Sequence, residues 1–189
     1  DGKKIIEYRK AMSLEKQPKS MVVVGSGAIG VEFAYLYNSI GTEVTIVEYL
    51  DRIVPVEDEE VSKALEKNYK KAGIKIMTSS EVTNVDTKGK NCKVTVKTAK
   101  GEEQLEAEIV LSAVGVATNI TEIGLEDVGV ATEKGKILVD DFYKTNVEGV
   151  YAIGDIVHGP ALAHVASAEG IICVEKIAGE NPQPLDYGN

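Results

Sequence analysis

Several residue types are scarce in this 189-residue sequence, and their scarcity excludes whole classes of protein. There is no tryptophan, there are two histidines, and the two cysteines, Cys92 and Cys173, lie far apart in the chain. A disulfide framework and a zinc spacing are therefore excluded, we expect no metal, and we expect a reducing compartment, the cytoplasm. No apolar run approaches the roughly 20 residues that span a bilayer, so no membrane partner is expected.

Positive charge is also scarce. The sequence has 21 Lys and Arg residues against 30 Asp and Glu, which gives a formal net charge of −9. This balance argues against nucleic acid as a partner, because phosphates would be repelled. The composition is otherwise that of a globular protein, with 43% hydrophobic and 27% charged residues. The first residue is Asp1, without a leader sequence, which hints at a piece of a longer protein.

The first part of the chain alternates β-branched runs with helical patterns. Residues 21–24 form a continuous apolar run, typical of a strand buried on both faces of a parallel sheet. Apolar residues then recur at helical spacing over 29–40, and residues 44–47 predict the next strand. A second helix is expected over about 58–72, followed by a strand at 74–77. This order predicts an α/β fold with a Rossmann-like βαβ unit.

The pattern changes after residue 80. Three short segments alternate apolar with polar residues and predict a three-stranded antiparallel meander: 82–85, 94–98 and 104–106. Residues 109–114 return to a buried strand. Beyond residue 140, a strand at 150–153 and a helix at 163–178 predict a partial second unit.

The strongest local motif is Gly25-Ser26-Gly27-Ala28-Ile29-Gly30, between the first strand and the first helix. Gly25 would permit a tight turn, Gly27 would let the backbone approach a pyrophosphate, and Gly30 would let helix and strand pack closely. The N–H groups at the helix start would then attract the phosphates. The sequence therefore predicts a dinucleotide site. The plainer alternative is a glycine-rich turn without a ligand.

An acidic residue completes the dinucleotide pattern. Glu48 follows the second strand, 18 residues after Gly30. A carboxylate at this place can accept hydrogen bonds from both hydroxyls of the adenosine ribose, and it would repel a 2′-phosphate. NAD is therefore favoured over NADP. Arg52, four residues further on, is the one feature that weakens this preference, and an ordinary surface glutamate is the alternative reading of Glu48.

Four stretches together resemble the pyridine nucleotide–disulfide oxidoreductases, and within that family the dihydrolipoamide dehydrogenases. They are the glycine motif with Glu32, residues 47–55, residues 110–119 and residues 145–170. The last stretch is the most diagnostic, because Gly159-Pro160-Ala161-Leu162-Ala163-His164 follows Gly154-Asp155. Related glutathione and mercuric reductases carry other residues at the position of His164.

The resemblance implies roles on the NAD side. It places Glu32 beside the nicotinamide and flavin rings, near hydride transfer, and it places the backbone of Val82 and Gly115 in the NAD site. Many relatives have Gly-Arg-x-Pro-Asn where this sequence has Gly115-Val116-Ala117-Thr118-Asn119. The missing arginine removes a candidate ligand for a 2′-phosphate, which agrees with NAD. Without the resemblance, Glu32 would be a solvated helix residue.

The resemblance also implies contacts with FAD. Asp155, after Gly154, would hydrogen-bond the ribityl chain. The residues that would run under the isoalloxazine ring are Ala161, Leu162, Ala163 and His164. A turn would equally explain Asp155, and a helix start would explain His164.

The chemistry of this family needs residues that the sequence lacks. A Cys-x-x-x-x-Cys pair and an FAD phosphate motif would lie upstream, and a His–Glu base would lie downstream across a subunit boundary. Cys92 and Cys173 match neither redox cysteine. We therefore expect a fragment without catalytic residues of its own. It should bind NAD weakly, and it should neither retain FAD nor turn over.

The resemblance implies three regions and a function for the parent. Residues 1–20 would be a lead-in from an FAD domain, 21–140 the NAD-binding domain, and 141–189 part of a central FAD-contacting segment. The parent would be a homodimer that oxidises dihydrolipoamide, carried on an acyltransferase subunit of a 2-oxo-acid dehydrogenase complex. Electrons would pass through a disulfide and FAD to NAD.

Two alternatives remain. One is another FAD- and NADH-dependent enzyme of the same family, such as an NADH oxidase or a different disulfide reductase. The Leu162-Ala163-His164 sequence argues against it. The other is a stand-alone NAD-binding module, against which Gly154-Asp155 argues, since such a module would not need it.

Overall fold

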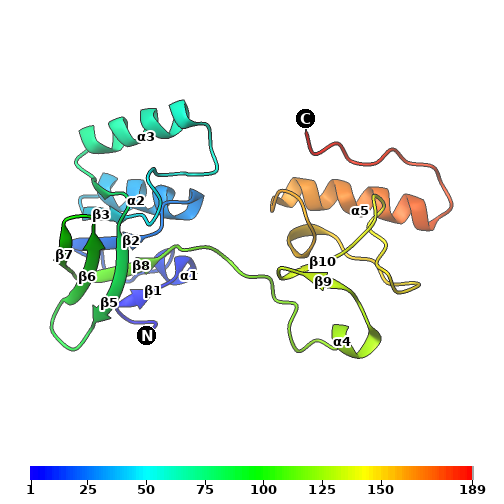
Figure 1. Ribbon diagram of the computed structural model, residues 1–189, viewed down its shortest axis with the longest axis horizontal. Coiled ribbons are helices and arrows are strands. Elements are labelled where there is room, and N and C mark those ends of the chain that lie inside the picture. Colours follow the sequence, from blue (N-terminus) through cyan, green and yellow to red (C-terminus); the bar gives the residue numbers. More distant parts are fainter. Residues whose placement is uncertain (189) are drawn as a thin grey trace. The chain divides into compact units, whose positions relative to one another are not determined.

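The structure, a computed structural model, describes residues 1–188 and divides into two compact units (Figure 1). The first unit is Asp1–Gly115, and the second begins at Val116. The first unit has two clusters of buried apolar side chains and the second unit has one, so each unit is described by itself.

A five-stranded parallel sheet forms the centre of the first unit, with the order β1-β8-β2-β3-β4. In that order the strands are Ile5–Ile6, Ile109–Ser112, Ser20–Val24, Glu43–Val47 and Lys75–Met77. The predicted parallel sheet is confirmed. From β2 the chain adds β3 and then β4 on one side of the sheet. It later returns to place β8 on the other side of β2, so the direction of strand addition reverses between β2 and β8.

One face of this sheet is covered by helices. Helix α1 spans Tyr8–Ala11, α2 spans Ala28–Ser39 and α3 spans Glu59–Lys71. Successive residues of a strand point to opposite faces, and Met21 and Val23 of β2 face this side. They pack in one buried cluster with Val31 of α2 and Tyr69 of α3. The apolar repeats read from the sequence only partly coincide with the sides that face the sheet, because Leu36 and Ile40 at the end of the first repeat and Val61 of α3 are exposed.

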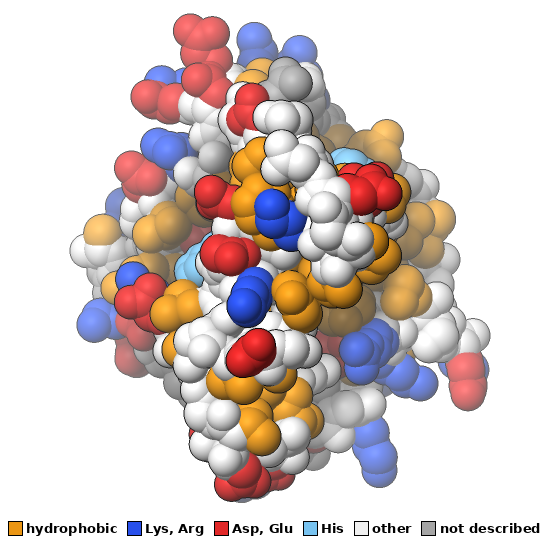
Figure 2. All heavy atoms as spheres, turned by 90° about the vertical axis from the view of Figure 1, so that its right-hand side faces the viewer, with side chains coloured by type: hydrophobic (Ala, Val, Ile, Leu, Met, Phe, Trp, Pro, Cys, Tyr) orange, Lys and Arg blue, Asp and Glu red, His pale blue; other side chains and the backbone are white. Residues whose placement is uncertain are grey.

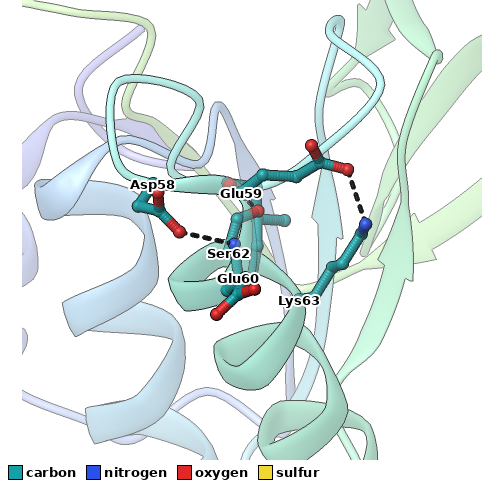
Figure 3. A network of polar contacts seen from close by, with 6 residues as sticks. Asp58, Glu59, Glu60, Ser62 and Lys63 are labelled. Atoms are coloured by element: carbon teal, nitrogen blue, oxygen red, sulfur yellow. Dashed lines mark hydrogen bonds and ion pairs between the residues drawn. The ribbon is translucent and has the colours of Figure 1, made fainter.

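Helix α3 begins with an acidic turn that suits the positive end of its dipole. The Asp58 carboxylate accepts a hydrogen bond from the Glu60 backbone N–H at 2.8 Å, and Glu59 pairs with Lys63 at 2.5 Å (Figure 3). The Ser62 hydroxyl donates to the Ile53 carbonyl at 2.6 Å and ties the helix to the preceding loop. These contacts explain why the helix begins at Glu59.

The other face of the parallel sheet is covered by a three-stranded antiparallel sheet of β5 (Glu81–Asp86), β6 (Cys92–Thr98) and β7 (Gly101–Ala107). Its buried side chains, including Val94, pack against Val22 of β2. The predicted meander is confirmed. The first unit therefore has three layers: helices, parallel sheet and antiparallel sheet.

The second unit has little regular structure. It contains α4 (Leu125–Val128), the hairpin strands β9 (Thr132–Glu133) and β10 (Lys136–Ile137), a 3₁₀ turn, η1 (Gly154–Ile156), and α5 (Ala163–Ile177). A small buried cluster holds them together, formed by Ile120, Val130, Ile137, Ala152 and Val157. The helix predicted at 163–178 agrees with α5.

Three features differ from the sequence-based predictions. Residues 1–20, for which no element was predicted, contribute β1 and α1 to the first unit, and Ile6 and Ala11 lie in its core. The compact units divide after Gly115 rather than after residue 140. The predicted strand at 150–153 is wrong: Tyr151 forms a single bridge with Lys144, because no neighbouring strand within the described chain pairs with the rest of the run.

The surface carries mixed chemistry. Figure 2 shows acidic, basic and apolar side chains interspersed over the face that it draws. Within residues 1–188, no helix combines the length and apolar character needed to cross a membrane. Over the same described residues, no group of three or more His, Cys, Asp or Glu side chains is placed to hold a metal ion.

Candidate functional site

A cavity of about 500 Å³ opens at the carboxyl ends of β2, β3 and β8 in the first unit. On one side it is lined by the glycine turn that follows β2, and on the other by Ala113, Val114 and Gly115 after β8. These two loops leave the sheet where its chain order reverses. In open α/β sheets, ligands bind in the crevice at such a switch point.

The three motif glycines meet three different steric demands. Gly25 has a φ of +95°, and a Cβ there would lie 2.5 Å from the Ala113 carbonyl oxygen. A Cβ at Gly30 would lie 2.1 Å from the Gly25 carbonyl oxygen, so the helix could not pack as closely on the turn. A Cβ at Gly27 would meet no described atom within 4 Å. Gly25 and Gly30 therefore shape the turn, whereas the space at Gly27 is left for something that approaches the backbone.

Helix α2 begins directly after this glycine turn, so its first backbone N–H groups lie at the turn. Gly27 is the N-cap residue, and no side chain of the described chain caps the helix there. The first turn of α2 contains no acidic residue either. Its N–H groups and the positive end of the helix dipole are thus available to an anion, which is the arrangement that phosphates use.

Glu48 borders the cavity and is held by three hydrogen bonds. Its side chain lies directly after β3, and the residue is only 7% exposed. One carboxylate oxygen, Oε2, accepts from the Ser26 backbone N–H at 2.8 Å and from the Ser26 hydroxyl at 2.5 Å. The other, Oε1, accepts from the Leu50 N–H at 2.8 Å. The carboxylate thus connects the end of β3 to the glycine turn.

The arginine that could favour a 2′-phosphate is bonded to the backbone of Pro55, a residue of the cavity wall. The Arg52 guanidinium donates to the Pro55 carbonyl at 3.0 Å. Arg52 also lowers the pKa of Glu59 by charge attraction, after the larger effects of the Lys63 hydrogen bond and charge. Arg52 is not among the described residues that line the cavity, whereas Glu48 is.

The cavity brings together six of the predicted site residues: Gly25, Ser26, Gly27, Glu48, Val82 and Gly115. Ala28, Ile29 and Gly30 form the first turn of α2 behind it. Glu32 also lies on α2, but it is exposed and does not line the cavity. The first unit therefore gathers the residues predicted for the adenosine and phosphates, and it does not bring Glu32 to them.

The sequence analysis missed several apolar walls of the cavity. Tyr49 and Leu50 follow β3, and Val114 follows β8; all three are exposed and line the cavity. A flat ring could lie against such side chains. The carboxyl ends of neighbouring parallel strands always lie at the same edge of the sheet. This rule predicts that the residues following β3 and β8 border one site.

The residues predicted for FAD lie in the second unit. Gly154 and Asp155 form η1, whose backbone carbonyl at Asp155 accepts a hydrogen bond from Lys136. Ala161 and Leu162 precede α5, and Ala163 and His164 are its first two residues. Asp155 and all of residues 161–164 are exposed.

A buried carboxylate in the second unit supports this turn and was not predicted as a site residue. Glu169 of α5 accepts from the Gly154 N–H at 2.5 Å and from the Tyr187 hydroxyl at 2.6 Å. Tyr187 in turn lies 3.1 Å from the Tyr143 hydroxyl. Burial, and then the hydrogen bond to Glu169, raise the pKa of Tyr187 well above its usual value, so this phenol stays protonated at neutral pH. Glu169 therefore fixes the position of η1.

Neither cysteine has the surroundings of a redox thiol. Both are free and buried. Burial raises the pKa of the Cys92 thiol and, likewise, that of the Cys173 thiol. A thiol with a raised pKa holds less reactive thiolate at neutral pH, so both side chains act as small apolar residues.

Comparison with known proteins identifies relatives along the whole chain. The family described as pyridine nucleotide-disulphide oxidoreductase matches residues 1–170. The dihydrolipoyl dehydrogenase of Rhizobium etli is 47% identical over 190 residues, which cover 100% of this chain and 40% of that protein. That of Chlorobaculum tepidum is 47% identical, with 98% of this chain and 40% of that protein covered. The leghemoglobin reductase of Glycine max is 42% identical, with 95% and 35% covered.

Solved structures agree with these relatives. LpdA from Mycobacterium tuberculosis matches with a TM-score of 0.89 and 31% identity, covering 98% of this chain and 40% of that chain. The HOCl-induced flavoprotein disulfide reductase RclA from Escherichia coli shares the fold, with a TM-score of 0.87 and 23% identity over 95% of this chain and 41% of that chain. The chain thus spans about 40% of the length of the first two curated relatives. Because the family match covers most of its residues, the chain belongs to the pyridine nucleotide–disulphide oxidoreductase family.

Proposed function

We propose that the cavity of the first unit binds the adenosine diphosphate half of NAD. The observation that carries the proposal is that Glu48, the open space at Gly27 and the uncapped start of α2 border one cavity. The phosphates would lie against the N–H groups at the start of α2. The ribose would donate a hydrogen bond to Glu48, and the adenine would lie between Leu50 and Val114. Val82 and Gly115 would line the path towards the nicotinamide.

The residues of this cavity support NAD rather than NADP. Glu48 would place a negative charge where a 2′-phosphate would lie, whereas Arg52 donates to the Pro55 carbonyl and does not itself line the cavity. Like charges at close range repel each other, most strongly where water is excluded. When bound, NAD supplies the acceptor for a hydride. We propose that Glu32 lies near that step in the complete protein.

For the complete protein we propose the activity named for its relatives. It would be a homodimeric dihydrolipoamide dehydrogenase that oxidises dihydrolipoamide on an acyltransferase subunit of a 2-oxo-acid dehydrogenase complex. A redox disulfide, FAD and NAD would accept the electrons in turn. Gly154, Asp155 and residues 161–164 would contact FAD there. The identity of 47% to two dihydrolipoyl dehydrogenases supports this activity. The free cysteines support the cytoplasm as the compartment.

The alternative for the complete protein is a different enzyme of the same family, which acts on another disulfide or electron acceptor. The relative from Glycine max is named leghemoglobin reductase and is 42% identical. The nucleotide site would be the same in both cases, because it depends on the first unit alone. The two activities differ in their second substrate, so assays of the complete protein with dihydrolipoamide distinguish them.

The NAD proposal is tested by calorimetric titration of the 189-residue chain and its Glu48→Gln variant. The substitution keeps the shape of the side chain and removes its charge. We expect NAD binding to weaken by about 1–3 kcal/mol, the cost of losing a charged hydrogen bond. Thermal unfolding of both proteins, with and without NAD, measures how much of the change is due to stability.

The matched control is Glu43→Gln. Glu43 is on the same strand as Glu48, but it is exposed and pairs with Lys75 at 2.6 Å. We expect it to leave the NAD affinity unchanged. If the unmodified chain binds no NAD, or if Glu48→Gln binds it as well as the unmodified chain does, the proposal fails.

A further inference from the structure

The geometry points to Ser26 as a positioning residue for cofactor specificity. We propose that Ser26 holds the Glu48 carboxylate in the one orientation that accepts a ribose hydroxyl and repels a 2′-phosphate. The inference rests on the proposed NAD function and goes beyond it, because it assigns the preference for NAD over NADP to a second side chain. Ser26 and Glu48 lie 22 residues apart in the sequence and meet at the cavity.

Ser26 acts through Glu48 and not on the ligand itself. It is 0% exposed, although it borders the cavity, so its hydroxyl faces the protein interior. That hydroxyl donates to Glu48 Oε2 at 2.5 Å, and the Ser26 N–H donates to the same oxygen at 2.8 Å. Two of the three hydrogen bonds to the carboxylate therefore come from one residue.

These bonds determine what the carboxylate can still accept. An ionised carboxylate has about four acceptor positions. Ser26 fills both positions on Oε2, and the Leu50 N–H fills one on Oε1. One position on Oε1 remains. Glu48 can then accept a single ribose hydroxyl, whereas the sequence predicted that it accepts both. A second bond would require the Ser26 hydroxyl to turn away.

A fixed carboxylate favours NAD in two ways. A side chain that is already ordered loses no rotamer freedom when the ribose binds, and this improves affinity. A carboxylate that cannot rotate also cannot turn away from a 2′-phosphate, so the repulsion between the two charges is retained in full. Removal of the Ser26 hydroxyl should therefore weaken NAD binding more than NADP binding.

The experiment titrates the 189-residue chain and its Ser26→Ala variant with NAD and with NADP. We expect the dissociation constant for NAD to rise about fivefold to tenfold in the variant. The constant for NADP should rise less, so the ratio of the NADP constant to the NAD constant falls about threefold or more. A residue that only supports the fold would change both constants alike and leave the ratio unaltered.

Ser62→Ala is the matched control. Ser62 is also 0% exposed, and its hydroxyl donates to a backbone carbonyl, that of Ile53, away from the cavity. It should leave both constants and their ratio unchanged. Ser26→Cys roughly keeps the buried volume but weakens the side-chain hydrogen bond to Glu48, because a thiol is a poorer donor than a hydroxyl. This variant replaces Ser26→Ala in the test if the alanine variant does not fold. The cysteine variant should shift the ratio in the same direction as the alanine variant.

The outcomes separate the two proposals. If the unmodified chain binds NAD but a folded Ser26 variant retains the same NAD constant and the same ratio, the role of Ser26 is wrong and the NAD site stands. Tighter NAD binding in Ser26→Ala also overturns it, since the hydroxyl would then compete with the ribose for Glu48. If the unmodified chain binds no NAD, the proposed function itself fails.

Discussion

At the scale of single residues, the three motif glycines and Glu48 show which features of the site the sequence motif predicts and which it does not. The sequence predicted a tight turn at Gly25 and close packing at Gly30, and the clashes that a Cβ would make agree with both. It could not predict that Ser26 bonds to Glu48, because that contact depends on how β2 and β3 align. A motif fixes the backbone nearby, whereas hydrogen bonds between distant side chains depend on the tertiary structure.

The different surroundings of Gly27 and Gly30 lead to a prediction for two variants. Gly27→Ala should cost less than about 1 kcal/mol of stability, mainly through a poorer helix cap. Its added methyl group points into open space that the pyrophosphate would use, so NAD affinity should fall by about tenfold or more. Gly30→Ala should instead destabilise the fold by about 3 kcal/mol, because its Cβ would meet the Gly25 carbonyl oxygen at 2.1 Å.

Urea unfolding and NAD titration of both variants measure these effects. The pair compares a methyl group that points into open space, at Gly27, with one that meets the backbone, at Gly30. A Gly27→Ala variant that binds NAD with unchanged affinity would show that the open space is not the phosphate site. A Gly30→Ala variant as stable as the unmodified chain would contradict the packing argument.

At the scale of elements, periodicity predicted the longer helices and strands well. Helices α2, α3 and α5 lie within one or two residues of the predicted ranges, and the meander is present. Each of these elements has apolar residues that recur at helical or alternating spacing over part of its length, and such patterns are local. The run at 150–153 has the composition of a strand, but a strand also requires a partner, and composition does not supply one.

Strand β1 is the opposite case. It has two residues, too few for any periodic pattern, and it forms because Ile5 and Ile6 pair with Val110 and Leu111 of β8. The pairing partners are more than 100 residues away in the sequence, so the segment looked like a polar lead-in. Its burial shows that it is part of the first unit.

A substitution in this segment tests that conclusion. Ile6 is 3% exposed and packs in the helix-side cluster of the sheet. Ile6→Ala should lower the free energy of unfolding of the 189-residue chain by about 2–4 kcal/mol, the usual cost of such a cavity. Met12, in the same segment, is 67% exposed, and Met12→Ala should change stability by less than about 0.5 kcal/mol. Urea unfolding followed by circular dichroism measures the free energy of unfolding of both variants. Equal stabilities for Ile6→Ala and Met12→Ala would contradict the conclusion that β1 is part of the core of the first unit.

At the scale of the whole molecule, the two units differ in how completely they form a site. The first unit gathers its predicted nucleotide residues around one cavity of about 500 Å³. A cavity of about 240 Å³ in the second unit is lined by Tyr143, His158 and Tyr187 among others, but by neither Asp155 nor residues 161–164. The sequence predicted residues for both cofactors; those predicted for NAD line the larger of these two cavities, and Asp155 and residues 161–164, predicted for FAD, line neither of the two.

This difference predicts which cofactor the 189-residue chain retains. The chain spans about 40% of the length of its dihydrolipoyl dehydrogenase relative from Rhizobium etli, and the first half of its glycine motif lines the cavity of the first unit. Asp155 and residues 161–164 are exposed, so they offer FAD few contacts that exclude water. Purified chain incubated with FAD and then gel-filtered should show no flavin absorbance, and it should have no NADH-dependent dye reduction. The same preparation should still bind NAD in a calorimetric titration, which shows that it is folded. A yellow protein with one FAD per chain would mean that the second unit holds the flavin without the remainder of the relatives' length.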